Sequence, residues 1–284
     1  MTIRYSIAVD GPPRFGRQAL GWLATGAALG GVTADQVLVQ CTDVVPDAFR
    51  RTVGRVFGVE VTALPGGSAS RGTLNKLSQL AHPALDGDWV VLCDCDTVFA
   101  ETLPASAFRS GIAAKLVDVG FPDLAFWTDL LGRLGLSNGQ LEGRPAANGG
   151  GLTYRNNCNG GLYVGDRAHW ARIAPAWRWA ADALPTWITA PPTWDHYFDQ
   201  IAFGVACARL GLDVELLPPR LNFPFHEDPP GPLEIQPIIL HHHQSLESAQ
   251  LHCRPGHALC PGVLSAVRRV NRVLDQLDWE AFGL

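Results

Sequence analysis

The sequence of 284 residues is poor in charge and has no long hydrophobic run. Charged residues make up 17% of the chain and hydrophobic residues 47%, which indicates a globular protein with a large core rather than a disordered one. No apolar stretch reaches the length of a membrane span. The 27 acidic residues outnumber the 22 basic ones, and the net charge of −5 argues against nucleic acid as a partner.

We also expect no secretory leader, since MTIRYSIAVDG reads directly as a strand. We therefore expect a cytoplasmic protein. The cysteines are seven, an odd number scattered through apolar surroundings. This pattern favours reduced thiols over a disulfide framework.

Two familiar nucleotide-binding signatures are also absent. Neither G-x-G-x-x-G, typical of Rossmann oxidoreductases, nor the P-loop G-x4-G-K-[ST] occurs. A sugar nucleotidyltransferase would carry a glycine-rich signature after its first strand, where this chain reads Asp10-Gly-Pro-Pro-Arg-Phe-Gly. A sugar nucleotidyltransferase is therefore a weak interpretation of this sequence.

Short apolar runs alternate with helical stretches, which predicts an α/β fold with a mostly parallel sheet flanked by helices. We expect one domain over residues 1–243, followed by a helical extension over 244–284. The expected strands are 5–9, 37–41, 60–64, 89–93, 160–164, 214–217 and 238–240. The expected helices are 17–29, 47–57, 73–81, 169–183, 196–210 and 263–277.

Two of these regions have alternative interpretations. The stretch 119–158 is rich in Gly, Asn and Pro, and reads as a partly irregular insertion that is either a lid or acceptor element or plain surface decoration. Its Trp127 and Tyr154 are candidates for stacking on a ligand, with burial in the core the stronger expectation. The amphipathic helix over 263–277 is expected to pack on the domain, and weak peripheral membrane association through its arginines is the alternative.

The clearest chemical signal is Asp94-Cys-Asp96, which ends the apolar run 89–93. In open α/β sheets ligands bind at the carboxyl ends of strands, and two carboxylates spaced i, i+2 can reach one divalent cation if the chain turns there. Such a cation can neutralise a diphosphate. The alternative is a pair of solvated loop aspartates that cap the next element.

Together with a nucleotide-binding first half and a later Asn-Gly-Gly strand, this motif resembles the GT-A glycosyltransferases. The likeness is to the retaining, family-8-like branch that includes glycogenin and bacterial galactosyltransferases, and it spans roughly residues 3–243. It implies a GT-A-like fold with a Rossmann-like nucleotide-binding half. It also implies transfer of a sugar from a nucleotide diphosphate, with a UDP-sugar favoured, to an acceptor that the sequence does not identify.

The resemblance assigns donor-binding residues in the first half of the chain. Ala8 and Asp10 match the strand that receives the base and ribose, with a plain strand-end aspartate as the alternative for Asp10. Lys76 matches a lysine near the donor phosphates, and Asp94 belongs to the same site. Arg71 is a weaker candidate for that role.

Further matches lie in the second half. Asn159-Gly160-Gly161 resembles an Asn-Ser-Gly strand that passes beneath the sugar, here with Gly in place of Ser. Asp199 and Gln200 resemble the pair beside the transferred sugar, and imply retention of anomeric configuration. An ordinary exposed helix turn, or Asp199 as a general base in an inverting reaction, are the alternatives.

The metal ligands implied by the resemblance are Asp94, Asp96 and His241. Imidazole beside carboxylates suits Mn²⁺ better than a purely Mg²⁺ site, so Mn²⁺ is the expected cofactor, with Mg²⁺ as the second choice. In a strand, residues 241 and 243 of the three consecutive histidines share one side, which leaves His243 as an alternative ligand. The family's Gly, Lys and Pro-Trp after this histidine are absent, since the chain continues Gln244-Ser-Leu-Glu.

A non-catalytic metal-binding protein is the alternative from another class. It would use the histidines and cysteines gathered near the end of the chain, although these lack the paired C-x2-C spacing of a convincing zinc site. The cluster comprises His241, His242, His243, His252, Cys253, His257 and Cys260.

Overall fold

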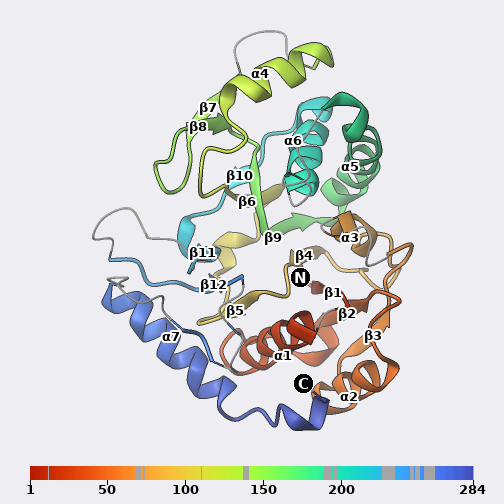
Figure 1. Cartoon of the computed structure of the whole chain (residues 1–284), viewed down its shortest axis with the longest axis vertical. Helices are drawn as coiled ribbons and strands as arrows, with labels where there is room; N and C mark the ends of the chain where they lie inside the picture. The colour runs from red at the N-terminus through yellow and green to blue at the C-terminus, as the bar shows by residue number, and fades with distance from the viewer. Residues whose placement is uncertain are drawn as a thin grey trace.

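A central mixed sheet of seven strands forms the middle of the molecule (Figure 1). The computed structural model describes residues 1–11, 13–67, 72, 74–109, 111–136, 141–188, 194, 197–225, 234–243, 246, 250–252 and 260–283. In the sheet, whose order is β10-β6-β9-β4-β1-β2-β3, only β9 runs against its neighbours. The strands are β1 Ile3–Val9, β2 Val37–Cys41, β3 Glu60–Ala63, β4 Trp89–Cys93, β6 Ile112–Leu116, β9 Cys158–Asp166 and β10 Glu215–Leu216.

Helices cover both faces of this sheet because β4 is apolar on both sides. Val91 and Cys93 pack into a cluster with α1 and α2, whereas Val90 and Leu92 pack into a second cluster with α5 and α6. The α/β, mostly parallel architecture predicted from the sequence is thereby confirmed. The helices are α1 Pro13–Ala28, α2 Asp47–Phe57, α3 Asn75–Gln79, α4 Leu124–Arg133, α5 Arg167–Trp187, α6 Phe198–Leu210 and α7 Pro261–Leu274.

Two small sheets complete the described part of the chain. The first joins β5 (Thr97–Phe99), β12 (Ile239–His241) and β11 (Phe223–Pro224), with β5 antiparallel to β12. The second is the hairpin of β7 (Gly143–Pro145) and β8 (Leu152–Tyr154), which lies beside α4. The first of these sheets places the end of β12 next to the turn that follows β4.

The range 119–158 is more regular than the sequence indicates. It contains α4 and the β7–β8 hairpin, and Asp123 begins α4 by accepting a hydrogen bond from the backbone N–H of Phe126 at 2.8 Å. Trp127 and Tyr154 are both buried, as the stronger expectation had it. Their rings pack 5.2 Å apart in the core and are therefore not available for stacking on a ligand.

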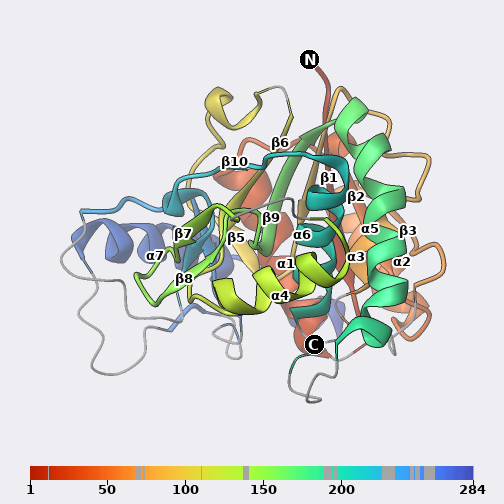
Figure 2. The same cartoon turned by 90° about the horizontal axis from the view of Figure 1, so that it is seen from above.

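The helix α7 packs as predicted. Its apolar face, which includes Val263, Val270 and Leu274, is buried against Val98 and Leu240 in a third cluster. Both views place α7 beside α1 and on the opposite side of the molecule from α5 (Figures 1 and 2). Among the described helices none is long and apolar enough to cross a bilayer.

Candidate active site

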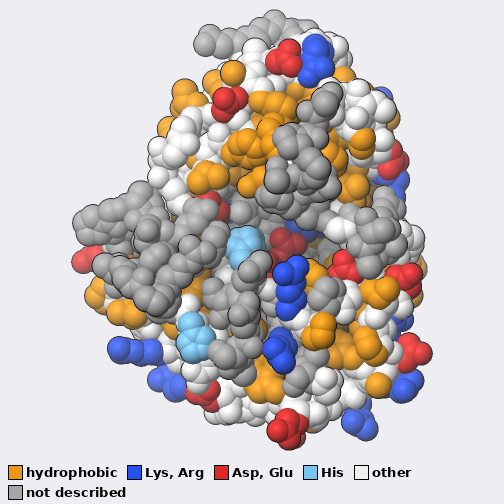
Figure 3. All heavy atoms as spheres, in the orientation of Figure 1, with side chains coloured by type: hydrophobic (Ala, Val, Ile, Leu, Met, Phe, Trp, Pro, Cys, Tyr) orange, Lys and Arg blue, Asp and Glu red, His pale blue; other side chains and the backbone are white. Residues whose placement is uncertain are grey.

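A cleft of about 690 Å³ opens where β1 and β4 end. The order of strands places the turn after β4 between the β1–β2 half of the sheet and the β9–β6 half. Figure 3 shows the corresponding face of the molecule, with a histidine and acidic side chains gathered near its centre. The described residues that line the cleft include Ala8, Asp10, Thr42, Lys76, Asp94, Asp96, Asp118, Phe121, Asn159, Gly160, Tyr197, Asp199, Gln200, His241 and His243.

Asp96, His241 and His243 form a group that could hold a metal ion. Their potential ligand atoms all lie within 4.8 Å of one another. Asp96 Oδ1 lies 3.2 Å from Nε2 of His241, and Asp96 Oδ2 lies 3.5 Å from Nδ1 of His243. Asp96 Oδ1 is buried, and apart from its contact with His241 it accepts no hydrogen bond from the described residues. A buried oxygen of this kind is suited to be a ligand of a cation.

Strand pairing explains why these residues meet. In the β5–β12 pair Thr97 faces His241, so Asp96 lies beside the histidine run. The backbone N–H of His242 donates to the carbonyl of Asp96 at 2.9 Å, while the His241 and His243 rings stack 4.0 Å apart. His242 does not belong to the metal group, in agreement with the predicted alternation of side chains.

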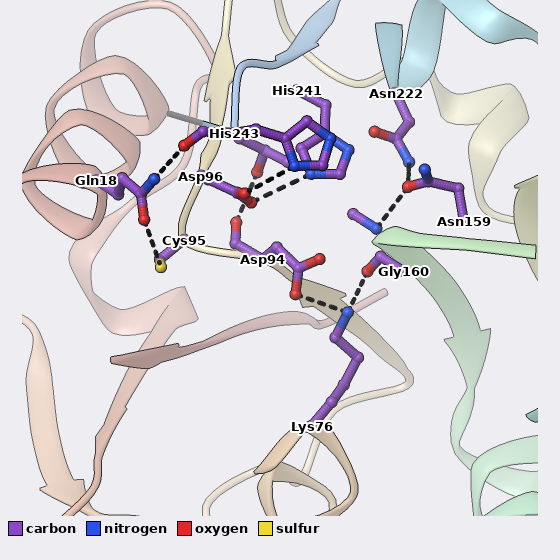
Figure 4. A network of polar contacts seen from close by, with 12 residues as sticks. Gln18, Lys76, Asp94, Cys95, Asp96, Asn159, Gly160, Asn222, His241 and His243 are labelled. Carbon is purple, nitrogen blue, oxygen red and sulfur yellow. Dashed lines mark hydrogen bonds and ion pairs between the residues drawn. The ribbon is translucent and has the colours of Figure 1, made fainter. Parts of the chain in front are cut away.

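His243 is held in a left-handed backbone conformation, with a φ of 50°. The side-chain amide of Gln18 in α1 donates a hydrogen bond to its carbonyl, and Cys95 Sγ lies 3.6 Å from Oε1 of the same glutamine (Figure 4). Such a conformation is uncommon for a residue with a side chain and persists only where its surroundings hold it. Gln18 thus fixes the position of a potential metal ligand.

Asp94 is engaged by Lys76 instead of by the histidines. Lys76 Nζ lies 2.6 Å from Asp94 Oδ1 and donates to the carbonyl of Gly160 (Figure 4). It also lies 3.8 Å from Asp199 Oδ2. The Lys76 side chain is only 5% exposed, whereas 35% of Asp94 faces the cleft. The structure therefore brings together Lys76, Asp94 and Asp199, which the sequence analysis placed near the donor phosphates and sugar.

The charges in this group alter one another's titration. Burial alone would lower the pKa of Lys76, but Asp94 and Asp199 raise it above its ordinary value. Enclosure raises the pKa of Asp94, with Lys76 opposing and Asp96 adding to the effect. Burial raises the pKa of Asp199 to about 6 against the opposing charge of Lys76. The two carboxylates thus favour the charged form of Lys76, whereas burial favours the protonated form of Asp94 and Asp199.

The Asn-Gly-Gly segment of β9 lies under this group. Asn159 Oδ1 accepts hydrogen bonds from the N–H of Gly161 and from the side chain of Asn222, both at 2.9 Å. A Cβ at Gly160 would lie 2.7 Å from Lys76 Nζ, and one at Gly161 would lie 2.6 Å from a His241 ring atom. Glycine is therefore required at both positions for the lysine and the histidine to approach the strand.

On the β1 side, Ala8 and Asp10 line the cleft together with Thr42. Asp10 Oδ1 accepts hydrogen bonds from Thr42 Oγ1 at 3.0 Å and from the N–H of Gly11 at 2.8 Å. This carboxylate is fixed at the mouth of β1 and can accept a further donor from a ligand.

On the other side, Asp199 and Gln200 lie at the start of α6 and line the cleft. The indole N–H of Trp177 donates to the carbonyl of Asp199 at 2.8 Å and anchors that turn. Asp199 is 2% exposed, and its Oδ1 accepts no hydrogen bond from the described residues. The arrangement differs from an ordinary exposed helix turn.

The sequence analysis missed Asp118, which also lines the cleft. It forms an ion pair with buried Lys115 and accepts a hydrogen bond from Asn159 Nδ2 at 3.1 Å. Asp118 follows β6, a strand that the sequence analysis did not predict. Had β6 been predicted, the strand-end carboxylate beside β9 would have been a signal of the same kind as Asp94-Cys-Asp96.

Three residues named in the sequence analysis, Arg71, Cys253 and His257, fall outside the described residues. Of the remaining members of the C-terminal His/Cys cluster, neither His252 nor Cys260 belongs to the metal group found among the described residues. The described cysteines are free thiols, which accords with the expected absence of a disulfide framework.

No protein-family model matches the chain, and no curated protein matches it either.

Proposed function

We propose that this protein is a metal-dependent glycosyltransferase that moves a sugar from a nucleotide diphosphate sugar to an acceptor hydroxyl. The observation that carries the proposal is the Asp96, His241 and His243 group in the middle of a cleft at the strand ends, with the Lys76–Asp94 ion pair beside it. The order of these features along the chain supports a GT-A-like fold and the family-8-like branch. Cytoplasmic localisation remains our expectation.

The charge of the cleft explains why the donor needs a cation. Among its described lining residues Lys76 is the one lysine or arginine, against the five carboxylates of Asp10, Asp94, Asp96, Asp118 and Asp199. A diphosphate brings further negative charge into this surface, and binding would be unfavourable without a divalent ion. When bound, the ion would neutralise charge on the departing nucleotide diphosphate.

Asp96, His241 and His243 would hold that ion, with the cleft-facing oxygen of Asp94 as a further ligand. Two imidazoles beside a carboxylate favour Mn²⁺ over Mg²⁺, because Mg²⁺ prefers oxygen ligands. The base and ribose would lie against Ala8 and Asp10 on the β1 side, where a UDP-sugar is our preferred donor. Lys76 would face the phosphates, as a buried cation close to the metal group.

In the transfer itself, the bond between the anomeric carbon and the terminal phosphate oxygen breaks, and a bond to the acceptor oxygen forms. The acceptor loses its proton to the departing phosphate, and the nucleotide diphosphate leaves. Asp199 and Gln200 would orient the sugar from the start of α6, which supports retention of configuration. The neighbouring Gly160 and Gly161 would let the sugar lie close to the backbone of β9.

Attachment to a membrane would have to use the exposed basic side chains of α7, because its apolar face is buried in the protein. We therefore propose that any association with a membrane is weak and peripheral, through Arg268 and Arg272.

Calorimetric titration of UDP with and without Mn²⁺ tests the function. We expect binding only with the metal, and we expect Asp96→Ala to abolish it while Asp182→Ala, an exposed aspartate in α5, leaves it unchanged. Binding of UDP that is undiminished in excess chelator would contradict the proposal.

NMR of the first product from an α-linked donor should then show an α-linkage; a β-linkage would recast Asp199 as a general base.

A further inference from the structure

The cleft has an apolar wall on the side away from β1. Val117, Val119 and Phe121, which follow β6, line it together with Tyr197, which precedes α6. We call these four residues the apolar wall. Val119 is 43% exposed although it is a branched apolar side chain. Figure 3 shows hydrophobic side chains gathered on this face between α4 and the central histidine.

Contacts between aromatic rings hold the wall in place. The ring of Phe121 packs edge-on against Trp194 at 4.7 Å and lies 5.0 Å from the ring of Tyr197. Trp194 in turn packs on Phe126 of α4 at 5.3 Å. Contacts of this kind fix ring orientation, so the wall presents a preformed surface rather than a set of mobile side chains.

The backbone of the wall is also fixed, by the segment that carries β7 and β8. The N–H and C=O of Val117 pair with Asn157 and Ala147, and the N–H of Gly120 pairs with the carbonyl of Gly150. The carbonyl of Phe121 accepts from the side chain of Asn157 at 3.2 Å. These backbone groups already form hydrogen bonds within the protein. A sugar placed on the wall would give up hydrogen bonds between its hydroxyl groups and water, and the wall would offer none in return.

Charge selects the ligand further. Asp118 and Asp199 lie next to the wall in the same cleft, and Lys115 already pairs with Asp118. Lys76 is likewise engaged by Asp94 and Asp199, so neither lysine is available to pair with an anionic ligand, whereas hydroxyl groups could donate to the carboxylates. The wall lies beside Asp199 and Gln200. The β1 side of the cleft, where we propose that the base and ribose bind, lies on the other side of the metal group.

We propose that the apolar wall binds an uncharged aromatic aglycone of the acceptor, with the acceptor hydroxyl directed toward Asp199 and Gln200. This inference rests on the proposed transferase function and names the substrate class of the same site. The aglycone would bury its flat face against Phe121 and Tyr197, and the hydroxyl-bearing part would meet the carboxylates.

The test compares matched glycosides that differ only in the aglycone. Methyl and 4-nitrophenyl β-glucosides, and the same pair of β-galactosides, are titrated into the full chain with UDP and Mn²⁺ present. We expect the aryl member of at least one pair to bind about tenfold more tightly, since a desolvated aromatic contact of this size corresponds to roughly that factor. The 4-nitrophenyl β-glucuronide, which is anionic, should bind more weakly than the aryl glucoside.

Variants locate the effect on the wall. Phe121→Ala and Tyr197→Ala should each remove most of the aryl preference, whereas Tyr197→Phe, which keeps the ring, should retain it. Leu152→Ala changes a residue of β8 that is 52% exposed and does not line the cleft, and should have no effect. Phe121→Leu, which preserves apolar volume without a ring, guards against loss of folding in Phe121→Ala and should also lower the preference.

Equal affinity for methyl and aryl glycosides in both pairs, no binding of either aryl glycoside, or a preference unchanged in the Phe121 and Tyr197 variants would overturn the inference. UDP affinity, measured on the same samples, separates this failure from that of the function. If UDP and Mn²⁺ bind while the aryl preference is absent, the wall proposal alone is wrong. If UDP does not bind with Mn²⁺, the transferase proposal and the inference that rests on it are both wrong.

Discussion

Two glycines in β9 determine how closely Lys76 and His241 approach the floor of the cleft. Lys76 donates to the carbonyl of Gly160, and His241 lies against Gly161. The lysine is buried, so its charge depends on Asp94 and Asp199 being within reach. Small displacements at the strand would separate these ions inside a poorly solvated site, where an unpaired charge is costly.

Gly160→Ala should therefore weaken metal-dependent UDP binding by at least about tenfold and destabilise the protein by about 1–3 kcal/mol, because the new methyl group would lie 2.7 Å from Lys76 Nζ. Gly132→Ala is the matched control. Gly132 lies in α4, and a Cβ there meets nothing within 4 Å, so alanine should be neutral or slightly stabilising. Calorimetry and urea unfolding measure both effects. Equal behaviour of the two variants would show that the close approach to Lys76 is unimportant.

The histidine run gives a second prediction for single residues. His241→Ala and His243→Ala should each lower Mn²⁺ affinity by about 10- to 100-fold, because each ring is one of the three candidate ligands. His82→Ala, whose ring contacts Thr62 away from the cleft, serves as the control and should bind Mn²⁺ normally. Mn²⁺ titration followed by electron paramagnetic resonance measures the affinities. An unchanged affinity in His243→Ala would leave His241 as the single histidine ligand.

Elements with a strong periodic pattern and a clear stop could be predicted from the sequence alone. β2, β4 and α2 have the expected bounds, and α2 ends at Gly58, whose φ of 67° suits glycine. The three-residue strand β5 was not predicted because it is too short to show a period. α4 was missed because the glycines and asparagines that follow it dominate the composition of 119–158, although Asp123 is a good N-cap.

The residues of the candidate site could also be predicted only where they adjoin elements with a clear sequence pattern. Asp94, Asp96, Asp199, His241 and His243 stand beside elements that the sequence analysis predicted, and the structure brings them into one cleft. Asp118 follows an unpredicted strand, and the role of Gln18 depends on a contact with His243 across 225 positions. Contacts between segments so far apart are set by tertiary packing and leave no local signal in the sequence.

The N-cap of α5 gives a prediction for an element outside the cleft. Asp166 accepts hydrogen bonds from the N–H groups of His169 at 2.8 Å and Gly111 at 2.9 Å. Burial alone would raise the pKa of Asp166, but these hydrogen bonds lower it below its ordinary value. Its stabilising contribution is therefore complete above the unfolded pKa, about 4, and is lost as pH falls through the lower folded pKa.

Asp166→Ala should accordingly destabilise the protein by about 1–2 kcal/mol at pH 7, with a smaller difference from the natural chain at pH 3. Asp182→Ala, in the exposed middle of the same helix, should change stability by less than about 0.5 kcal/mol. Urea unfolding at both pH values measures the differences. A loss that grows on acidification would mean that the sign of the Asp166 pKa shift is wrong.

At the scale of the whole molecule, we expect residues 1–243 and the helical extension over 244–284 to unfold as one cooperative unit. α7, together with Leu246 and Leu251, shares a buried cluster with β5 and β12, the strands that bring Asp96 and His241 together. The ring of Phe282 also stacks on Phe57 of α2, at 6.0 Å. The end of the chain thus covers the sheet that positions the metal group.

Two leucines of α7 test whether this segment belongs to the cooperative core. Leu274 is fully buried and approaches Gly21 of α1, whereas Leu264 on the same helix is 36% exposed. Leu274→Ala should destabilise the whole protein by about 2–5 kcal/mol, and Leu264→Ala by less than about 1 kcal/mol, since only the first leaves a cavity. Thermal unfolding should remain a single transition in both variants, and Mn²⁺ affinity at low temperature should be unchanged, because neither leucine touches the ligands.

If the segment were a separable extension, Leu274→Ala would instead release α7 in an early transition while circular dichroism showed the rest of the protein unfolding at its original temperature. A chain ending at residue 243 would then fold and bind Mn²⁺ normally, whereas in a cooperative molecule its exposed apolar cluster should lead to aggregation.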